Sequence, residues 1–387
     1  PRALTVVGSE TVGILANADL AVIPLFLLMG GFATAGGLSA DIYRLAQALF
    51  GFQRGGLAMA TIGGSAGFGA LTGSSLATAA TIGSAALPQM RERGYSTALS
   101  TGCVAAGATL GQLVPPSTAV VVYAILTELS IGKLYIAILG PAALTVALYM
   151  AAIAVYVHVV PRSAPGRAKF DAAELGAAFV RALPVLGMFA AVIGGIYFGV
   201  FTATEAAALG AVFAFAIALA RGKLRGAALW EVAAETTRST AMIYGLMIGA
   251  MLISFFFGVS GLPAFVTGIA GESGLPALGI IALLVLVYIA LGTVMDSFAI
   301  MIVTTPLAAP LIQSLGYDPV WWGIMMVVLV ELGVVTPPFG LNLFMLKSLV
   351  PDVPLTTIFR GVLPFVAADL VKIVLLIAFP GIALWLL

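Results

Sequence analysis

The sequence predicts an all-α polytopic membrane protein that is built as an inverted repeat, with two re-entrant helical hairpins and two discontinuous helices. Of its 387 residues, 61% are hydrophobic and 9% are charged, and the mean hydropathy is +1.16, whereas soluble domains carry about 25% charged residues. Two Pro-Pro pairs, Pro115-Pro116 and Pro337-Pro338, interrupt apolar runs long enough to cross a bilayer. Because lipid offers no water to the carbonyl groups that each proline frees, the broken backbone is expected to face protein or a watery cavity.

The two Pro-Pro pairs belong to a longer repeat. They lie 222 residues apart, and the same offset aligns Gly94-Tyr95 with Gly316-Tyr317 and Gly111 with Gly333. This alignment has no gap, and it pairs glycine with glycine and proline with proline, the residues that most constrain or free the backbone. Such an alignment indicates a duplicated unit. One interrupted helix in the corresponding position of each copy predicts a transporter whose binding site lies near the membrane midplane.

Each copy contributes half of a transport domain, and the other segments form a scaffold. The first hairpin has a Gly/Ser-rich middle with about a dozen residues on either side, fewer than the roughly 20 that a crossing needs. The predicted segments are a first scaffold helix and an interfacial arm helix (1–54), a transport half (55–132) with a hairpin (55–88, tip at Leu71–Ser75) and a broken helix (98–127), scaffold helices and a second arm helix (133–272), a second transport half (275–348) with a hairpin (275–314, tip at Gly292–Ser297) and a broken helix (320–346), and a last scaffold helix (349–387).

Positive charge sets the orientation. The loops with Arg91 and Arg93, with Arg162 to Lys169, and with Arg221 to Arg225 are expected in the cytoplasm, since basic residues concentrate there. The number of crossings between these clusters then places the two copies in opposite orientations. The sequence begins at Pro1 without a methionine, and we expect a further N-terminal segment to precede it.

Several functional classes are excluded by what the sequence lacks. No basic cluster with interleaved aromatic residues is present, which excludes a nucleic-acid partner. Cys103 and His158 are the lone cysteine and histidine, so neither a disulfide framework nor a zinc or haem site can be built, and we expect both residues to be structural. The chain contains no phosphate-binding glycine loop and no nucleophile–base set, which argues against ATP hydrolysis and against an enzyme.

The hairpin tips and helix breaks carry groups suited to a small cation and an anion. Hydroxyl, carboxylate and amide oxygens come from Ser74, Ser75, Asp296, Ser297, Thr336 and Asn342. Half-helices that begin near Ser75, Ser117, Ser297 and Gly340 would present free N–H groups to a carboxylate. Since a bound Na⁺ and an organic anion offset each other's desolvation, this composition predicts symport.

Other intramembrane charges have competing interpretations. Asp296, at a hairpin tip, is interpreted as a site residue rather than as a satisfied buried acid. Glu331 is either an ion or proton ligand or a structural partner of the neighbouring backbone, and the sequence does not decide between them. Asp369 and Lys372, three residues apart, are interpreted as a mutually neutralising pair, and Glu205 as a first-turn partner of its helix dipole.

Several motifs carry a family resemblance that covers essentially the whole chain. They are GSAGFGALTGSSLATAATIG from Gly64, GATLGQLVPPSTAVVVYAILTELSIGK from Gly107, MDSFAIMIVTTPLAAPLIQSLGYDP from Met295, and ELGVVTPPFGLNLFMLK from Glu331. Together they resemble the large membrane subunit of tripartite ATP-independent periplasmic (TRAP) transporters, whose members usually carry an additional N-terminal hydrophobic segment that is absent here. The resemblance implies a multi-pass protein of the bacterial inner membrane that belongs to the elevator-type transporters.

The resemblance also implies an activity, partners and site residues. The activity is Na⁺-coupled import of an organic acid, such as a C4-dicarboxylate or a sugar acid, which a periplasmic substrate-binding protein delivers and for which a small membrane subunit braces the large one. Na⁺ would be held by Ser74, Ser75, Gly111 and Pro115 in the first half and by Asp296, Ser297, Thr336 and Gly340 in the second, and the substrate would lie between the tips, near Ser75, Ser117, Ser297 and Asn342.

Two alternatives stay open at this point. A standalone Na⁺/carboxylate elevator symporter would share the architecture and work without a binding protein. A membrane-embedded enzyme or a passive channel would belong to another class, although the chain offers no nucleophile and base for the former. The identity of the organic acid is not encoded in any recognisable residue.

Overall fold

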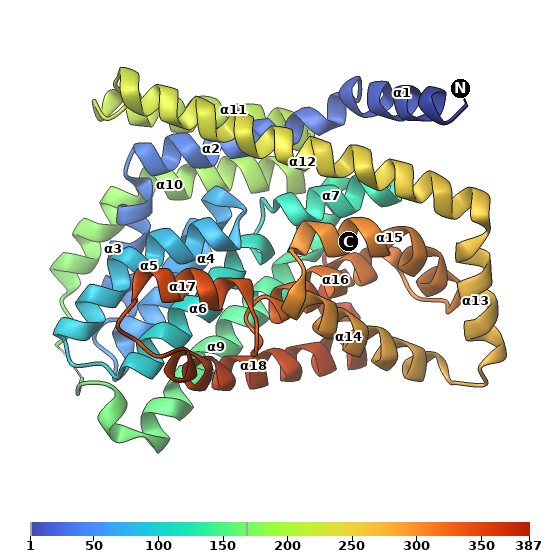
Figure 1. Ribbon diagram of the computed structural model, residues 1–387. Coiled ribbons are helices and arrows are strands. Elements are labelled where there is room, and N and C mark those ends of the chain that lie inside the picture. Colours follow the sequence, from blue (N-terminus) through green and yellow to red (C-terminus); the bar gives the residue numbers. More distant parts are fainter. Residues whose placement is uncertain (1, 168) are drawn as a thin grey trace.

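The computed structural model describes residues 2–167 and 169–387, and within these residues every regular element is a helix (Figure 1). Pro1, where the sequence begins, lies outside the described residues. The elements are α1 (Arg2–Leu15), η1 (Ala18–Ala21), α2 (Val22–Ala35), α3 (Leu38–Phe50), α4 (Gly56–Thr72), α5 (Ser75–Glu92), α6 (Thr97–Leu113), α7 (Thr118–Thr127), α8 (Ile131–Ala137), α9 (Leu139–Val159), η2 (Pro161–Ser163), α10 (Ala172–Tyr197), α11 (Ala203–Ala220), α12 (Gly226–Ser260), α13 (Leu262–Glu272), α14 (Ala277–Val294), α15 (Ser297–Ser314), α16 (Pro319–Gly333), α17 (Leu341–Leu349), α18 (Leu355–Ala378) and α19 (Gly381–Leu384).

Eight helical segments of the described chain are long and apolar enough to cross a membrane, and the bent pair α6–α7 would make a ninth. This agrees with the predicted class of all-α polytopic membrane protein. The eight segments are Ala18–Ala35, Ile131–Val159, Ala172–Tyr197, Ala203–Ala220, Gly226–Ser260, Ala277–Val294, Ser297–Ser314 and Leu355–Ala378.

Both Pro-Pro pairs interrupt a helix, and both bonds between the paired prolines are cis. The axis bends by 41° between α6 and α7. The residue before the first pair, Val114, has an extended backbone (φ −84°, ψ 125°), which is the conformation that a following proline ring favours. In the second half, residues 334–340 separate α16 from α17.

The arms of the first hairpin are longer than about a dozen residues, because the glycine-rich stretch stays helical. α4 has 17 residues and α5 has 18. The glycines of α4 allow α3 to approach closely: a Cβ on Gly63 would lie 3.1 Å from the ring of Phe50, and one on Gly64 would lie 2.7 Å from the ring of Tyr43. In this segment glycine therefore serves helix packing rather than chain reversal.

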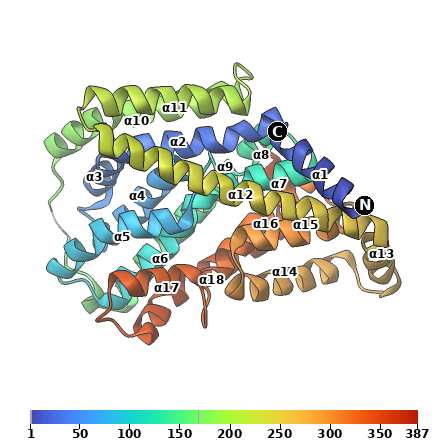
Figure 2. The same cartoon turned by 45° about the horizontal axis from the view of Figure 1, so that its top comes forward.

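α12 and α13 lie at the periphery of the molecule and pack against α2 and α15. α12 is a continuous helix of 35 residues that runs along the molecule and leads into α13, as both views show (Figure 1, Figure 2). α13 has no buried residue, whereas α3 packs closely against α4 and α10. α3 and α13 occupy the sequence positions at which the arm helices are expected.

Helices from the two halves of the sequence pack crosswise. α5, the second arm of the first hairpin, packs against α17, which follows the second break. Correspondingly, α15, the second arm of the second hairpin, packs against α7, which follows the first break. The four half-helices that begin at the tips and breaks thus form two cross-half pairs around the centre of the molecule.

Candidate ion and substrate site

The tip of the first hairpin touches the first helix break directly. The Thr118 hydroxyl donates a 2.9 Å hydrogen bond to the carbonyl oxygen of Gly73, which has a positive φ of 60°. Behind the tip, a Cβ on Gly111 would lie 2.5 Å from the Ser74 carbonyl oxygen and equally close to the Thr78 hydroxyl. Backbone therefore meets backbone at this crossing, and any side chain at position 111 would separate the two elements.

Helix-capping serines occupy both sides of this contact. Ser74 caps α5 by accepting a hydrogen bond from the Ala77 N–H at 3.3 Å, and Ser117 caps α7 by accepting one from Val120 at 3.4 Å. Ser75 is the first residue of α5 and is buried, as is Pro115. The four residues predicted to hold the first Na⁺ (Ser74, Ser75, Gly111 and Pro115) thus lie on elements in direct contact.

The second hairpin and the second break repeat this arrangement. The Gly340 N–H donates a 3.4 Å hydrogen bond to the carbonyl oxygen of Thr293, just before the tip. A Cβ on Gly292 would lie 2.8 Å from the Cα of Gly333, so α14 and α16 cross through glycine. Asp296 caps α15 by accepting a 2.9 Å hydrogen bond from the Phe298 N–H, and its side chain is exposed.

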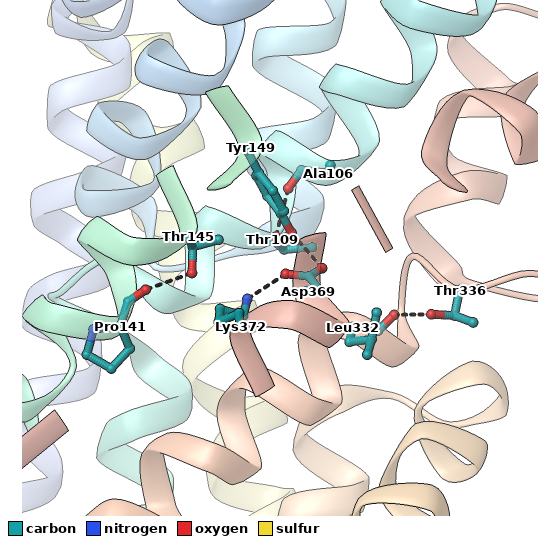
Figure 3. A network of polar contacts seen from close by, with 9 residues as sticks. All are labelled: Ala106, Thr109, Pro141, Thr145, Tyr149, Leu332, Thr336, Asp369 and Lys372. Atoms are coloured by element: carbon teal, nitrogen blue, oxygen red, sulfur yellow. Dashed lines mark hydrogen bonds and ion pairs between the residues drawn. The ribbon is translucent and has the colours of Figure 1, made fainter. Parts of the chain in front are cut away.

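Two further residues of the second set lie beside this contact. The buried Ser297 hydroxyl donates to Glu331 on α16 at 3.5 Å. The Thr336 hydroxyl donates a 2.6 Å hydrogen bond to the Leu332 carbonyl oxygen (Figure 3), which holds the side chain on the last turn before the break. Asp296, Ser297, Thr336 and Gly340 therefore come from two adjoining elements, as the residues of the first set do.

Asn342 has binding capacity that the described protein does not use. It lies one residue inside α17, is fully buried, and its backbone N–H donates to Val334 at 3.1 Å. Both side-chain amide atoms lack a hydrogen-bond partner among the described residues. Leaving a buried donor or acceptor unpaired costs about 1–3 kcal/mol, so this amide is suited to binding a polar ligand.

The four residues predicted to contact substrate, namely Ser75, Ser117, Ser297 and Asn342, share no hydrogen bond with one another in the described part of the chain. A cavity of about 450 Å³ lies beside the first tip and reaches Ser74 and Thr72. Its opposite wall is α12, which contributes Glu231, Glu235 and Ser239. The volume falls within the range of small-molecule sites, which is about 300–1,000 Å³.

A buried charged network links three helices, α6, α9 and α18 (Figure 3). Lys372 forms a 2.6 Å salt bridge with Asp369, and their side chains are 3% and 2% exposed. This confirms the predicted neutralising pair on α18. The other Asp369 oxygen accepts a 2.7 Å hydrogen bond from the hydroxyl of Tyr149 on α9, which lies 3.3 Å from the hydroxyl of Thr109 on α6.

Glu331 adjoins this network from α16. One of its oxygens accepts the hydrogen bond from Ser297, and the other is buried without a partner among the described residues. Its described partner is thus a side chain on the second hairpin rather than neighbouring backbone.

Sequence reasoning missed Tyr149 and Thr109. Each is a polar residue inside an apolar helix, a weak signal that becomes meaningful when Asp369 is found opposite them. The expectations for other residues were simpler. Glu205 forms a capping box with Thr202 at the start of α11, which confirms its predicted first-turn position. Cys103 is fully buried, and His158 lies in the last turn of α9.

The chain matches known transporters along almost its whole length. The family model described as "Tripartite ATP-independent periplasmic transporter, DctM component" matches residues 2–382. The C4-dicarboxylate TRAP transporter large permease protein DctM of Pseudomonas aeruginosa is 36% identical over 366 residues, which cover 94% of this chain and 85% of that protein. The isethionate TRAP transporter permease protein DctMQ of Oleidesulfovibrio alaskensis is 33% identical over 370 residues, which cover 94% of this chain and 57% of that protein.

A solved structure shares the fold. The YdaH transporter of Alcanivorax borkumensis aligns with a TM-score of 0.67 at 16% identity, and the alignment covers 99% of this chain and 89% of that one. At this identity the similarity concerns the fold alone. Together with the family match and the eight helices able to cross a bilayer, it completes the assignment: this chain belongs to the DctM family, the large permease components of TRAP transporters in the bacterial inner membrane, and it is a transporter subunit rather than an enzyme.

Proposed function

We propose that this large permease subunit imports an organic acid together with Na⁺ by an elevator mechanism. A periplasmic substrate-binding protein would deliver the acid, and a small membrane subunit would complete the permease. The relatives are named for C4-dicarboxylate and isethionate, which are both small organic anions, and this supports an anionic substrate. The isethionate relative is named DctMQ, and this chain spans 57% of its length.

The main support for this proposal is that, in each half of the chain, the tip of a hairpin contacts the break in a helix. In each half, a hairpin tip and a helix break are in direct contact: the Thr118 hydroxyl bonds the Gly73 carbonyl oxygen, and the Gly340 N–H bonds the Thr293 carbonyl oxygen. Unwound backbone carbonyls beside the ends of half-helices are the groups that coordinate Na⁺ in membrane transporters. We assign one Na⁺ to Ser74, Ser75, Gly111 and Pro115, and another to Asp296, Ser297, Thr336 and Gly340.

The substrate carboxylate is assigned to the starts of the half-helices. The N-termini of α7 and α17 carry the partial positive charge of a helix dipole, which favours an anion. Ser117 and Asn342 lie at these two starts, and the unpaired Asn342 amide can donate to a carboxylate oxygen. Ser75 and Ser297 occupy the equivalent first positions of α5 and α15.

The buried network indicates which helices move together. The Tyr149 hydroxyl bonds Asp369 on α18 and lies 3.3 Å from the Thr109 hydroxyl on α6, so sliding α9 past either helix would break one of these buried polar contacts. α18 also crosses α6 at Gly102 and Gly361, where backbone meets backbone. We therefore assign α9 and α18 to the moving unit, although the sequence alone favours placing 133–272 and 349–387 in the scaffold.

Transport into proteoliposomes tests this function. The subunit would be reconstituted with its small membrane partner and supplied with radiolabelled organic acids, with and without a Na⁺ gradient and the cognate binding protein. Uptake that requires both supports the proposal. Uptake that requires Na⁺ but no binding protein would instead indicate a standalone symporter, and uptake indifferent to Na⁺ would contradict coupling.

Matched capping variants test the two Na⁺ assignments. Asp296→Asn should raise the Na⁺ concentration for half-maximal uptake at least tenfold, whereas Asp318→Asn should not, although Asp318 caps α16 through the same kind of bond. Ser74→Ala should act in the same way, with Ser96→Ala as its control, since both serines cap a helix at 3.3 Å. Equal effects within a pair would mean that capping alone is responsible.

A further inference from the structure

A second polar cavity lies away from the tips and breaks, among the helix ends near the turn between α11 and α12. Its volume is about 600 Å³, and α3, α5 and α10 contribute to its walls. Four basic side chains line it: Arg44 on α3, Arg181 on α10, and Arg221 and Lys223 after α11. Asp41 is the acidic side chain among its lining residues, so the cavity carries a formal charge of +3.

The single carboxylate is already engaged. Arg221 forms a 2.6 Å salt bridge with Asp41 and also donates to the Gly36 carbonyl oxygen at 3.2 Å. The other three cations, Arg44, Arg181 and Lys223, form no ion pair or side-chain hydrogen bond with any residue that the structure describes. These three side chains are solvent-exposed, and an anion held between them would be attracted by all three charges at once.

Neutral hydrogen-bonding groups complete the cavity. Gln47 on α3 donates a 2.6 Å hydrogen bond to Gln89 on α5, which ties the arm helix to the first hairpin at this point. Ser39, another lining residue, has a buried hydroxyl group without a partner among the described residues. Its side chain is a donor for which the described protein provides no acceptor.

The surroundings of the cavity are apolar. Val180 and Leu183 flank Arg181 on α10 and are 63% and 47% exposed, and Leu219, two residues before Arg221, is 56% exposed. Exposed aliphatic side chains next to unpaired guanidinium groups suit a molecule that has an anionic head and apolar chains. Basic pockets between membrane helices bind anionic lipid headgroups for this reason.

We propose that the cavity lined by Arg44, Arg181, Arg221 and Lys223 binds the phosphate group of an anionic phospholipid, whose acyl chains lie along α10 and α11. The bound headgroup joins the arm helix α3 to α10 and to the turn after α11 through charge, beside the Gln47–Gln89 bond between α3 and α5. The site is distinct from the tips and breaks, so its occupancy can be measured without transport.

Native mass spectrometry of the purified subunit with its small partner tests this site. The complex, in neutral detergent, would be titrated with phosphatidylglycerol, with phosphatidylcholine, and separately with inorganic phosphate. Arg44→Gln, Arg181→Gln and their double variant remove charge from the cavity, whereas Arg238→Gln is the control, because Arg238 is an exposed arginine of α12 that pairs with Glu235 outside the cavity. Unfolding temperatures in phosphatidylcholine identify any variant that folds poorly.

We expect phosphatidylglycerol to be retained in preference to phosphatidylcholine, with an affinity about fivefold weaker for each cation removed and unchanged in Arg238→Gln. Equal retention of the two lipids, or equal retention by the cavity variants and the control, would overturn the proposal. Stabilisation by inorganic phosphate that depends on Arg44 and Arg181, without any preference for phosphatidylglycerol, would show that the site takes a soluble anion and would overturn the lipid assignment.

Discussion

The hydroxyl group of Tyr149 donates a 2.7 Å hydrogen bond to Asp369, which lies 220 residues further along the chain and is salt-bridged to Lys372. The bond connects α9 to α18 in a region from which water is excluded. Because Asp369 and Lys372 are buried, removing either charge or the Tyr149 hydroxyl group should lower the stability of the protein.

Removing one partner of the buried pair should destabilise the protein strongly. Asp369→Ala leaves the Lys372 ammonium group buried without its carboxylate, and a loss of about 3–5 kcal/mol in unfolding free energy is expected. The double variant Asp369→Leu/Lys372→Met should lose less unfolding free energy than the sum of the losses in the two single variants. Thermal unfolding in detergent measures this, and strict additivity of the two changes would show that the charges do not interact.

Tyr149→Phe should cost about 1.5–3 kcal/mol, because it removes a hydrogen bond to a charged group. Tyr156→Phe, on the same helix, is the matched control, since the Tyr156 hydroxyl has no hydrogen bond within the described residues. The readout is the difference in unfolding temperature between the two variants. If Tyr156→Phe were equally damaging, loss of a hydroxyl group from α9 in general, rather than of the bond to Asp369, would be responsible.

Gly111→Ala should separate the first tip from α6, because the new Cβ would lie 2.5 Å from the Ser74 carbonyl oxygen. A loss of about 1–3 kcal/mol is expected from this overpacking, together with weaker Na⁺ dependence of uptake. Gly245→Ala is the control: nothing lies within 4 Å of its added Cβ, so it should stabilise α12 by about 0.5–1 kcal/mol. Effects of the same sign at both positions would contradict the close crossing.

Asn342→Leu should separate stability from transport. Replacing a buried amide that lacks partners by an apolar side chain of similar size should leave the unfolding free energy unchanged or raise it by about 1–3 kcal/mol. Uptake should fall at least tenfold if the amide binds substrate. Ser348→Ala, at an exposed position on α17, should change neither quantity. Normal uptake by Asn342→Leu would remove this residue from the substrate site.

The sequence predicted the fold best at positions where a residue's own backbone chemistry decides the local structure. Pro115-Pro116 and Pro337-Pro338 predict interrupted helices because proline has no N–H group to donate, and the structure has a helix end before each pair. Gly63 and Gly64 were harder to interpret. The same residue serves both chain reversal and close helix packing, and the neighbouring ring of Tyr43 that decides between them comes from another helix.

The candidate site was predictable only in part. Residues that begin half-helices, such as Ser117, can be found from their position after a break. The role of Tyr149 depends on α18 lying beside α9, a relationship between distant segments that no local pattern encodes. The cavity cations are likewise ordinary loop and helix charges until the fold brings Arg44 and Arg181 together.

The length of α12 has a mechanical consequence. Its 35 residues form a rod of about 52 Å, but its charged residues Glu231, Glu235 and Arg238 all lie in the first half. Residues 239–260 are uncharged and span about 33 Å, close to the roughly 30 Å thickness of a bilayer's hydrocarbon core. A thinner bilayer would be accommodated by tilting this half, and Glu231 and Glu235 in the other half of the same unbroken helix line the cavity that reaches Ser74.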